Sequence, residues 1–378
     1  MRINLILCFL LCYSFASFSQ RLNKEDVMSK LNLANVYWQE NNKPTLWSFW
    51  DVAAYHTGNM ELYKLTRNEA YRNYSEAWAV HNEWKGAKSD NKAEWKYSYG
   101  EKDDYVLFGD WQTCFQTYID LYNLDPKPYK IARAIEVMEY QMSTRRTTVS
   151  TPNNAYLWWA DGLYMVMPVM TKMYKLTGDE LYLDKMYSYL QYADSIMYDK
   201  KEALYYRDAK YVYPKHKSEN GKKDFWARGD GWVFAGLAKV LQDLPKDHQH
   251  YNFYVQRYQD MAEAIAKCQQ KEGYWTRSML DPNHAPGPEA SGTAFFTYGF
   301  LWGINNGLLA EKKYIPIAKS GWRFLSETAL QEDGRVGYIQ PIGEKAIPGQ
   351  VVDAQSTASF GVGAFLLAGS EMYRYLNQ

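Results

Sequence analysis

Apolar residues recur at steps of three and four through most of the chain, which is the spacing of one face of an α-helix. Over residues 132–142, for example, Ile135 and Met138 fall on such a face. Counted in pairs, these stretches predict roughly twelve helices. Alternating patterns are rare, and only residues 203–213 and 334–339 predict short β-hairpins.

One four-residue phrase occurs three times, each time at the end of an amphipathic stretch and before another that opens near a tyrosine. The copies are Tyr63-Lys64-Leu65-Thr66, Tyr122-Asn123-Leu124-Asp125 and Tyr174-Lys175-Leu176-Thr177. The last residue of each copy suits a turn or a helix N-cap, because its side-chain oxygen accepts free backbone N–H groups. A repeat of this kind indicates successive helical hairpins.

Twelve helices in a period of roughly fifty residues predict an all-α fold, in which six helical hairpins close into an (α/α)6 barrel with short β-hairpins at its rim. In this arrangement the segment after Leu22 pairs with the last helix, from Gln355. An open helical solenoid is the main alternative. Closure is favoured because the terminal repeat of a solenoid needs a polar outer face, whereas the last helix carries Phe360, Val362 and Phe365.

The first segment has the features of a secretory signal peptide. Met1-Arg2 supplies a positive charge, residues 3–18 are almost wholly apolar, and small residues precede Gln20. The apolar run is shorter than the ~20 residues of a membrane span, and no later run approaches that length. We therefore predict a signal peptide at residues 1–19, a single barrel domain at residues 20–378, and export to the periplasm or out of the cell.

Charge and aromatic content narrow the class of partner. The 43 Lys and Arg residues balance 43 Asp and Glu residues, which argues against nucleic-acid binding because phosphates require a cationic excess. Aromatic residues make up 17% of the chain, an excess that favours either stacking on sugar rings or the filling of a large helical core. Only Cys114 and Cys268 follow the signal peptide, so neither a disulfide framework nor a zinc site is predicted.

Two aspartates stand where helices are expected to begin. Asp110 follows Phe108-Gly109, and Asp161 follows Trp158-Trp159-Ala160. Both precede the repeated phrase by a similar number of residues, so a ring of hairpins would bring them to the same mouth on adjacent inner helices. Two facing carboxyl groups are the usual equipment for glycoside chemistry. The alternative is that each aspartate is an N-cap, which Pro168 would also fit because proline suits the start of a helix.

A third phrase, Phe225-Trp226-Ala227-Arg228-Gly229-Asp230-Gly231-Trp232, combines glycines, aromatic rings and a guanidinium. Trp226 and Trp232 bracket Arg228, whose planar fork matches a carboxylate. The alternative is a helix-entry turn packed by tryptophans. The spacing of glycines fits neither a phosphate loop nor a dinucleotide-binding motif.

Taken in order along the chain, these phrases resemble those of the unsaturated uronyl hydrolases of glycoside hydrolase families 88 and 105, and more closely family 105, the unsaturated rhamnogalacturonyl hydrolases. The resemblance runs from Trp47-Ser48-Phe49-Trp50 to Gly337-Tyr338-Ile339-Gln340. It implies an (α/α)6 barrel, no metal or other cofactor, and an unsaturated acidic oligosaccharide as the substrate. Such enzymes remove the 4,5-unsaturated uronic acid that polysaccharide lyases leave at a non-reducing end.

By this resemblance Asp161 matches the general acid/base of the family, and Asp110 matches its second active-site aspartate. The chain departs from the family at Asp230, where Asn is usual, and in Tyr205-Tyr206-Arg207-Asp208, where the family tends to carry His. The lysines that follow, up to Lys223, indicate either a solvated loop or contact with an acidic glycan. Substrate contacts are predicted at Trp159, Trp226, Arg228, Trp232 and Arg207.

The resemblance also implies hydration of the double bond rather than direct displacement. Asp161 in its acid form would protonate C4, and its carboxylate would then take a proton from the water that adds to C5. Burial against Trp159 and repulsion from Asp110 would keep the acid protonated. The alternatives are an inverting glycosidase or an epimerase on the same barrel, which would use saturated sugars, and a non-catalytic glycan-binding protein.

Overall fold

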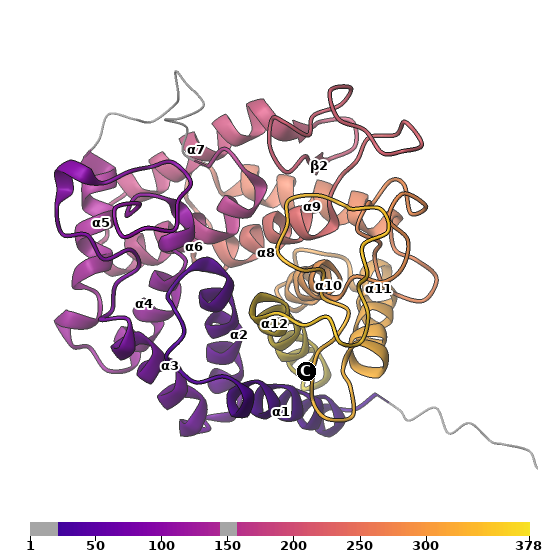
Figure 1. Cartoon of the computed structure of the whole chain (residues 1–378), viewed down its shortest axis with the longest axis horizontal. Helices are drawn as coiled ribbons and strands as arrows, with labels where there is room; N and C mark the ends of the chain where they lie inside the picture. Colours follow the sequence, from indigo (N-terminus) through magenta and orange to yellow (C-terminus); the bar gives the residue numbers. More distant parts are fainter. Residues whose placement is uncertain (1–21, 144–156) are drawn as a thin grey trace, which may run out of the picture.

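The computed structural model describes residues 22–143 and 157–378, and within them the chain forms a ring of helices (Figure 1). The predicted signal peptide lies outside the described residues. The inner helices are α2 (Trp50–Thr66), α4 (Cys114–Leu124), α6 (Ala160–Thr177), α8 (Ala227–Asp243), α10 (Ala290–Asn305) and α12 (Ser359–Leu376). The outer helices are α1 (Lys24–Asn41), α3 (Glu69–His81), α5 (Ala132–Ser143), α7 (Leu181–Met197), α9 (Tyr251–Lys267) and α11 (Glu311–Phe324).

The helices of the two rings differ in how many of their faces are buried. In α9, Tyr254, Tyr258, Met261 and Ile265 are buried at steps of three and four, so this outer helix turns one apolar stripe inward. In α10, by contrast, every residue from Ala290 to Gly303 is buried. A helix that is covered on all sides belongs to the core of the molecule, so the inner ring is itself the core.

The ring of inner helices is closed, which excludes the open solenoid. Each inner helix contacts the next, and α12 completes the circle by packing against both α10 and α2, while α1 lies outside α12 (Figure 1). Glycines make the contact between α2 and α12 very close. A Cβ atom added at Gly58 would lie 2.2 Å from the carbonyl oxygen of Gly363, and one added at Gly363 would lie 2.4 Å from that of Ala54. Only glycine therefore fits at this crossing.

Helix α6 begins eight residues before Pro168 and continues through it. This start agrees with the prediction that a helix begins near Asp161, and Pro168 lies inside the helix, two turns from its start. Proline lacks the N–H that would bond the carbonyl of Tyr164, one turn earlier. Gln116 of α4 replaces that bond, because its amide donates to the carbonyl of Tyr164 at 2.9 Å. The same hydrogen bond joins α4 to α6.

The repeated phrases end helices, as predicted, but the N-caps of the next helices lie further along. Thr66 and Thr177 each accept a hydrogen bond, at 3.2 Å, from the backbone N–H two residues later. The side chain that caps α3 is that of Asn68, and Asp125 is the C-cap of α4. These residues therefore form the turns between helices rather than the helix starts.

Short helices and one small sheet complete the described part of the chain. The strands β1 (Tyr198–Asp199) and β2 (Leu204–Tyr205) form an antiparallel hairpin, which overlaps the predicted range 203–213 only at its second strand. The predicted hairpin at 334–339 is reduced to one bridge, between Leu330 and Val336. The remaining short elements are η1 (Lys92–Glu94), η2 (Gly109–Trp111), η3 (Pro128–Lys130) and the π-helical η5 (Leu325–Ala329).

Each of three loops at one mouth of the ring is held by a backbone hydrogen bond of the same kind. The loop that follows a helical hairpin returns to the first residue of that hairpin's inner helix and accepts its N–H. The pairs are Ala160 with Arg207 (2.8 Å), Ala227 with Arg277 (2.9 Å) and Ala290 with Tyr338 (2.7 Å). Each bond satisfies an N–H that the start of a helix would otherwise leave free.

Within the described ranges, none of the helices has both the length and the apolar composition needed to cross a membrane. The two cysteines in these ranges, Cys114 and Cys268, are buried and unpaired, as the sequence predicts.

Candidate active site

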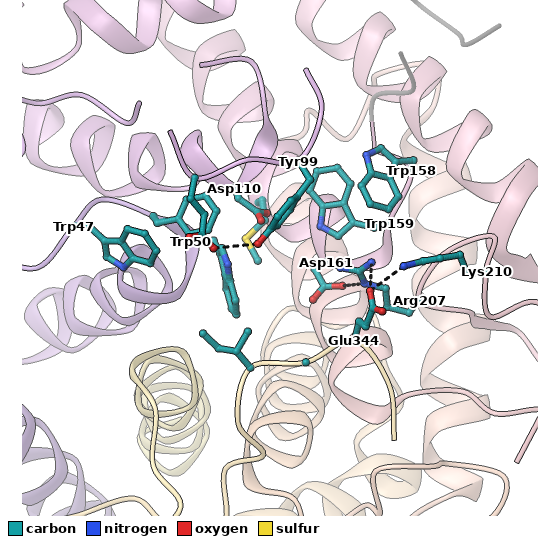
Figure 2. A pocket seen from close by; sticks show the side chains of 15 residues that line it. Trp47, Trp50, Tyr99, Asp110, Trp158, Trp159, Asp161, Arg207, Lys210 and Glu344 are labelled. Carbon is teal, nitrogen blue, oxygen red and sulfur yellow. Dashed lines mark hydrogen bonds and ion pairs between the residues drawn. The ribbon is translucent and has the colours of Figure 1, made fainter. Parts of the chain in front are cut away.

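A cavity of about 490 Å³ opens at the end of the barrel where the inner helices begin (Figure 2). Six aromatic residues and six Asp, Glu, Arg or Lys residues are among the fifteen that line it. Of the seven site residues predicted from the sequence, Asp110, Asp161, Trp159 and Arg207 line the cavity. The other lining residues are Trp47, Phe49, Trp50, Tyr99, Glu101, Trp158, Met165, Lys210, Ile342, Gly343 and Glu344.

Asp161 lies in the first turn of α6, and its side chain points into the cavity (Figure 2). The residue is 8% exposed, and its Oδ2 atom lies 3.5 Å from Nε of Arg207. Burial raises the pKa of Asp161 above its ordinary value, while the charges of Arg207 and Arg228 oppose the rise. Burial therefore favours the acid form of Asp161, and Arg207 lies close enough to stabilise its anion.

Asp110 lies in the short helix η2, immediately before α4, and is 6% exposed. Burial raises its pKa well above the ordinary value, the negative charge of Asp161 adds to the rise, and Arg207 opposes it. The electrostatic coupling between Asp110 and Asp161 is expected of two carboxyl groups in one cavity. The interpretation of these aspartates as N-caps was wrong, since Phe108 and Trp159 occupy those positions and make no capping bond with their side chains.

A third carboxyl group belongs to the same electrostatic cluster. Asp51 lies in the first turn of α2, and burial raises its pKa to about 6, with a smaller contribution from the charge of Glu101. The charge of Asp51 in turn raises the pKa of Asp110. Sequence reasoning missed Asp51, although it directly follows the aromatic phrase that ends at Trp50, just as Asp161 follows Trp158-Trp159.

The aromatic wall beside Asp161 is built around Trp159. Its ring stacks on Phe108, with centroids 4.9 Å apart and planes inclined by 25°. Glycines make room for it: a Cβ added at Gly109 would lie 3.2 Å from the indole, and one added at Gly162 would lie 3.0 Å from it. Larger residues at either position would push the indole away, so the phrases around the two aspartates also position the ring between them.

Arg207 lies among three carboxylates at the cavity mouth. Its Nη1 atom is 2.7 Å from Oδ2 of Asp208 and 3.3 Å from Oε2 of Glu344, in addition to the contact with Asp161. Glu344 also contacts Nζ of Lys210 at 3.1 Å, so the mouth carries a linked row of charges (Figure 2). Despite burial, these carboxylates hold the pKa of Arg207 above its ordinary value. The guanidinium is therefore a permanent charge beside Asp161.

The remaining predicted residues, Trp226, Arg228 and Trp232, are buried behind the cavity and do not line it. The guanidinium of Arg228 donates to the carbonyls of Gln340 at 2.6 Å and Pro341 at 2.9 Å. It is stacked between the ring of Trp226, 4.5 Å away, and that of Phe360, 4.8 Å away. Burial lowers its pKa to about 10. From this position Arg228 acts on the cavity through its charge and through the loop that it holds.

Trp226 and Trp232 have packing partners of their own. The indole N–H of Trp226 donates to the side chain of Gln340 at 2.9 Å. Trp232 is fully buried, with its ring 4.2 Å from that of Phe295. Substrate contact by Trp226, Arg228 or Trp232 stays a prediction, and in this structure their direct contacts are with the protein.

Three inner helices start with the same local pattern, which explains where Arg228 sits. The phrases Trp159-Ala160-Asp161-Gly162, Trp226-Ala227-Arg228-Gly229 and Glu289-Ala290-Ser291-Gly292 align residue by residue. In each, the alanine N–H is tied to a loop carbonyl. Asp161, Arg228 and Ser291 are therefore equivalent by position. Their side chains differ in length, and the long arginine side chain reaches past the cavity wall to the carbonyls of the next loop.

No group of three or more His, Cys, Asp or Glu side chains in residues 22–143 and 157–378 is arranged to hold a metal ion.

Comparison with known proteins identifies the family. A sequence model described as Glycosyl Hydrolase Family 88 matches residues 19–376. The chain belongs to that family. A curated relative from Formosa agariphila, an unsaturated 3S-rhamnoglycuronyl hydrolase, is 35% identical over 93% of this chain and 92% of its own length.

Solved structures agree with this membership. A family 88 glycosyl hydrolase from Bacteroides vulgatus is 60% identical, with a TM-score of 0.90 over 94% of this chain and 100% of that one. A protein described as a polysaccharide lyase is 65% identical, with a TM-score of 0.89 over 94% of this chain and 98% of that one. Solved family 105 structures, at 18–22% identity, share the fold. The resemblance to families 88 and 105 and the predicted helical barrel are thus confirmed, and the family model that matches is that of family 88 rather than family 105.

In this family 88 chain, the residues that sequence reasoning missed come mostly from loops. Tyr99 and Glu101, whose side chains are 3.0 Å apart, lie between α3 and η2, and Glu344 lies between η5 and α12. Nothing in the periodicity of the helices indicates where such loops cross the mouth. Asp230, where the family resemblance implies Asn, has a structural role: its carboxyl group accepts the N–H of Tyr205 at 2.8 Å and holds β2 against α8.

Proposed function

We propose that this protein removes a 4,5-unsaturated uronic acid from the non-reducing end of lyase-generated oligosaccharides, by hydration of the C4=C5 double bond. The observation that carries the proposal is the pair of buried carboxyl groups, Asp161 and Asp110, whose pKa values are both raised inside one aromatic cavity. Such groups remain acids at a pH where ordinary carboxyl groups are ionised. The names of the curated relatives support the substrate class.

The proposed reaction begins with proton transfer from Asp161 to C4 of the enol ether. Positive charge then develops at C5 and the ring oxygen, close to the new Asp161 carboxylate. That carboxylate takes a proton from the water that adds to C5, which restores the acid. The product is a hemiketal, which opens and expels the aglycone. Asp161 must therefore exist in both forms, and burial opposed by Arg207 supports both.

An inverting glycosidase is less well supported by the same geometry. That mechanism needs one carboxylic acid and one carboxylate that acts as a base from the start. Here burial raises the pKa of both Asp110 and Asp161, so neither is favoured as a resident anion. A protonated Asp110 would instead donate a hydrogen bond to the substrate. A non-catalytic glycan-binding role would not require two buried carboxyl groups with raised pKa values, which are typical of catalytic sites.

The test is turnover of unsaturated oligosaccharides from pectin, ulvan and glycosaminoglycan lyases, followed by ultraviolet absorbance of the conjugated double bond. We expect absorbance to fall as the aglycone is released, and in D₂O the product should carry one deuterium at C4. Asp161→Asn should lower kcat by about 10²–10⁴-fold, the usual contribution of a general acid. The control is Asp247→Asn, which changes an exposed carboxylate.

Each competing function gives a different result in this assay. Absorbance that rises on an intact polysaccharide would indicate a lyase, the activity named for the 65% identical structure. Release of sugar from saturated oligosaccharides would indicate an ordinary glycosidase. Binding without any turnover would indicate a glycan-binding protein. Any of these results, with no loss of absorbance on unsaturated substrates, would overturn the proposal.

We also propose that the protein acts outside the cytoplasm, after cleavage before Gln20. The support is the sequence of residues 1–19, with its positive start and apolar run. Mass spectrometry of the protein from periplasmic and culture fractions should find an N-terminus at Gln20. Recovery of the protein in the cytoplasm with residues 1–19 intact would contradict export.

A further inference from the structure

The carboxylate of Glu344, which comes from a distant loop, pairs with the cations Arg207 and Lys210 at the mouth of the cavity. Glu344 lies between η5 and α12, far in sequence from the residues that it contacts. Its Oε1 accepts the hydroxyl of Tyr211 at 2.5 Å, and its Oε2 accepts from Lys210 at 3.1 Å and from Arg207 at 3.3 Å. Figure 2 shows Glu344 pointing toward Arg207 and Lys210 at the same end of the cavity as Asp161.

The contact with Arg207 is the weakest of the three. At 3.3 Å it is the longest, and the same nitrogen makes a shorter bond, of 2.7 Å, to Asp208. The side chain of Glu344 is 42% exposed, so it has room to move, whereas that of Arg207 is 15% exposed. Glu344 can thus leave Arg207 and remain bound to Tyr211 and Lys210.

The charges at the mouth are already balanced before any ligand enters. Arg207 and Lys210 carry two positive charges, and Asp208 and Glu344 carry two negative ones. The other acids of the cluster, Asp51, Glu101, Asp110 and Asp161, add only negative charge as they ionise. Among the described residues that line this cavity, a ligand carboxylate therefore finds no cation without a carboxylate partner, and Arg228 behind the wall donates to backbone carbonyls. Such a ligand pairs with Arg207 or Lys210 only in competition with a resident carboxylate.

The position of Arg207 fits the carboxylate of the proposed substrate. That carboxylate is attached to C5, the neighbour of the carbon that receives the proton. A substrate that places its C4 atom within reach of Asp161 therefore also places its carboxylate within reach of Arg207, whose guanidinium lies 3.5 Å from Asp161. A guanidinium has several N–H donors in one plane, so it can bind a second carboxylate while it keeps Asp208.

We propose that Glu344 is a placeholder carboxylate: it occupies Arg207 in the empty cavity, and the uronate carboxylate of the substrate takes its place. Glu344 then sets how strongly the site prefers acidic over neutral sugars. The identity of the displacing group rests on the proposed function, whereas the competition itself is a property of any carboxylate ligand. The competing explanation is that Glu344 only tethers its loop through Tyr211 and Lys210.

The experiment compares the binding of glucuronic acid with that of its uncharged methyl ester, by calorimetry on the full-length protein. Glu344→Gln keeps the size of the side chain and removes its charge. We expect the Kd of the acid to fall by about two- to fivefold, because ion pairs of partly exposed groups are weak, and the Kd of the ester to stay the same. Tyr211→Phe, which removes the tether without touching Arg207, should leave the Kd of the acid unchanged.

A double-mutant cycle tests the role of Arg207. In an Arg207→Gln background, Glu344→Gln should no longer change the Kd of the acid, since the contested cation is gone. The proposal is overturned if Glu344→Gln weakens both ligands equally, as loss of a tether would, or if it tightens the acid as much without Arg207. These measurements need no turnover, so the absence of hydrolase activity would overturn the proposed function and leave the competition to be judged by binding alone.

Discussion

Replacement of Asp51 by Asn should make the protein more stable at neutral pH. The carboxyl group of Asp51 interacts with backbone N–H groups at the start of α2 and with the side chain of Trp47, but its Oδ1 atom is buried without a hydrogen-bond partner. Burial raises its pKa from 3.8 to about 6. Well below pH 3.8 the group is protonated in both the folded and the unfolded chain, so it costs nothing. Between about pH 4 and pH 6 the unfolded chain ionises the group while the folded chain keeps it protonated, so the stability falls across this window and stays at the lower value above it.

The size of the effect follows from the pKa. A shift of about two units corresponds to about 3 kcal/mol, at 1.36 kcal/mol per unit. Asn carries no charge, so the free energy of unfolding of Asp51→Asn should exceed that of the wild type by at most about 3 kcal/mol near pH 8 and by almost nothing near pH 4. Over roughly 350 residues the entropy of unfolding is about 0.7 kcal/mol/K, so the difference corresponds to a rise in Tm of about 4 °C.

The assay is thermal unfolding of both proteins, followed by circular dichroism from pH 4 to pH 8. Asp120→Asn is the matched control of opposite sign. Asp120 is partly buried, but Lys172 and Lys64 lower its pKa below 3.8, so its loss should destabilise the protein by a nearly constant amount from pH 4 to pH 8. A Tm difference for Asp51→Asn that is the same at pH 4 and pH 8, or that is negative at pH 8, would refute the electrostatic reasoning.

Two further predictions concern the ring and the cavity. Gly58→Ala should lower Tm by several degrees or prevent folding, because its Cβ would lie 2.2 Å from the Gly363 carbonyl. Gly343→Ala, whose Cβ would meet its nearest neighbour at an ordinary 3.7 Å, controls for loss of glycine, and equal Tm values for the two variants would contradict a tight seam. Trp159→Phe should admit water beside Asp161 and so lower its pKa. The alkaline limb of the kcat profile should then move to lower pH, and an unmoved limb would show that Trp159 does not set the pKa.

The fold was predictable because the pattern of apolar residues reports burial directly. The outer helices show one stripe, and the last helix is apolar on every side, which correctly indicated closure. The contact of Gly58 with Gly363 was not predictable, because a helical glycine looks the same in sequence whether or not another backbone lies against it. The continuation of α6 through Pro168 was not predictable for a similar reason, since the replacement donor, Gln116, lies on another helix.

The candidate site was predictable where it lies on the repeat and not elsewhere. The matched offsets of Asp110 and Asp161 placed them correctly in one cavity. Asp51 was open to the same reasoning, because it too follows an aromatic phrase at the start of an inner helix. Glu344 could not be predicted in this way, because it lies in an irregular loop whose sequence has no repeating pattern. Exposure was the hardest property to predict: Arg228 has the chemistry of a ligand, but backbone carbonyls take up its donors.

The backbone bond from Ala160 to Arg207 has a consequence for how such enzymes diverge. One backbone hydrogen bond, 2.8 Å long, fixes the segment before Asp161 to the segment that bears Arg207. Insertions or replacements further along the Arg207 loop, toward Lys223, can therefore remodel the mouth while Asp161 and Arg207 keep their relative positions. The mouth of this barrel can thus change its shape and charge without a change in the geometry of this pair.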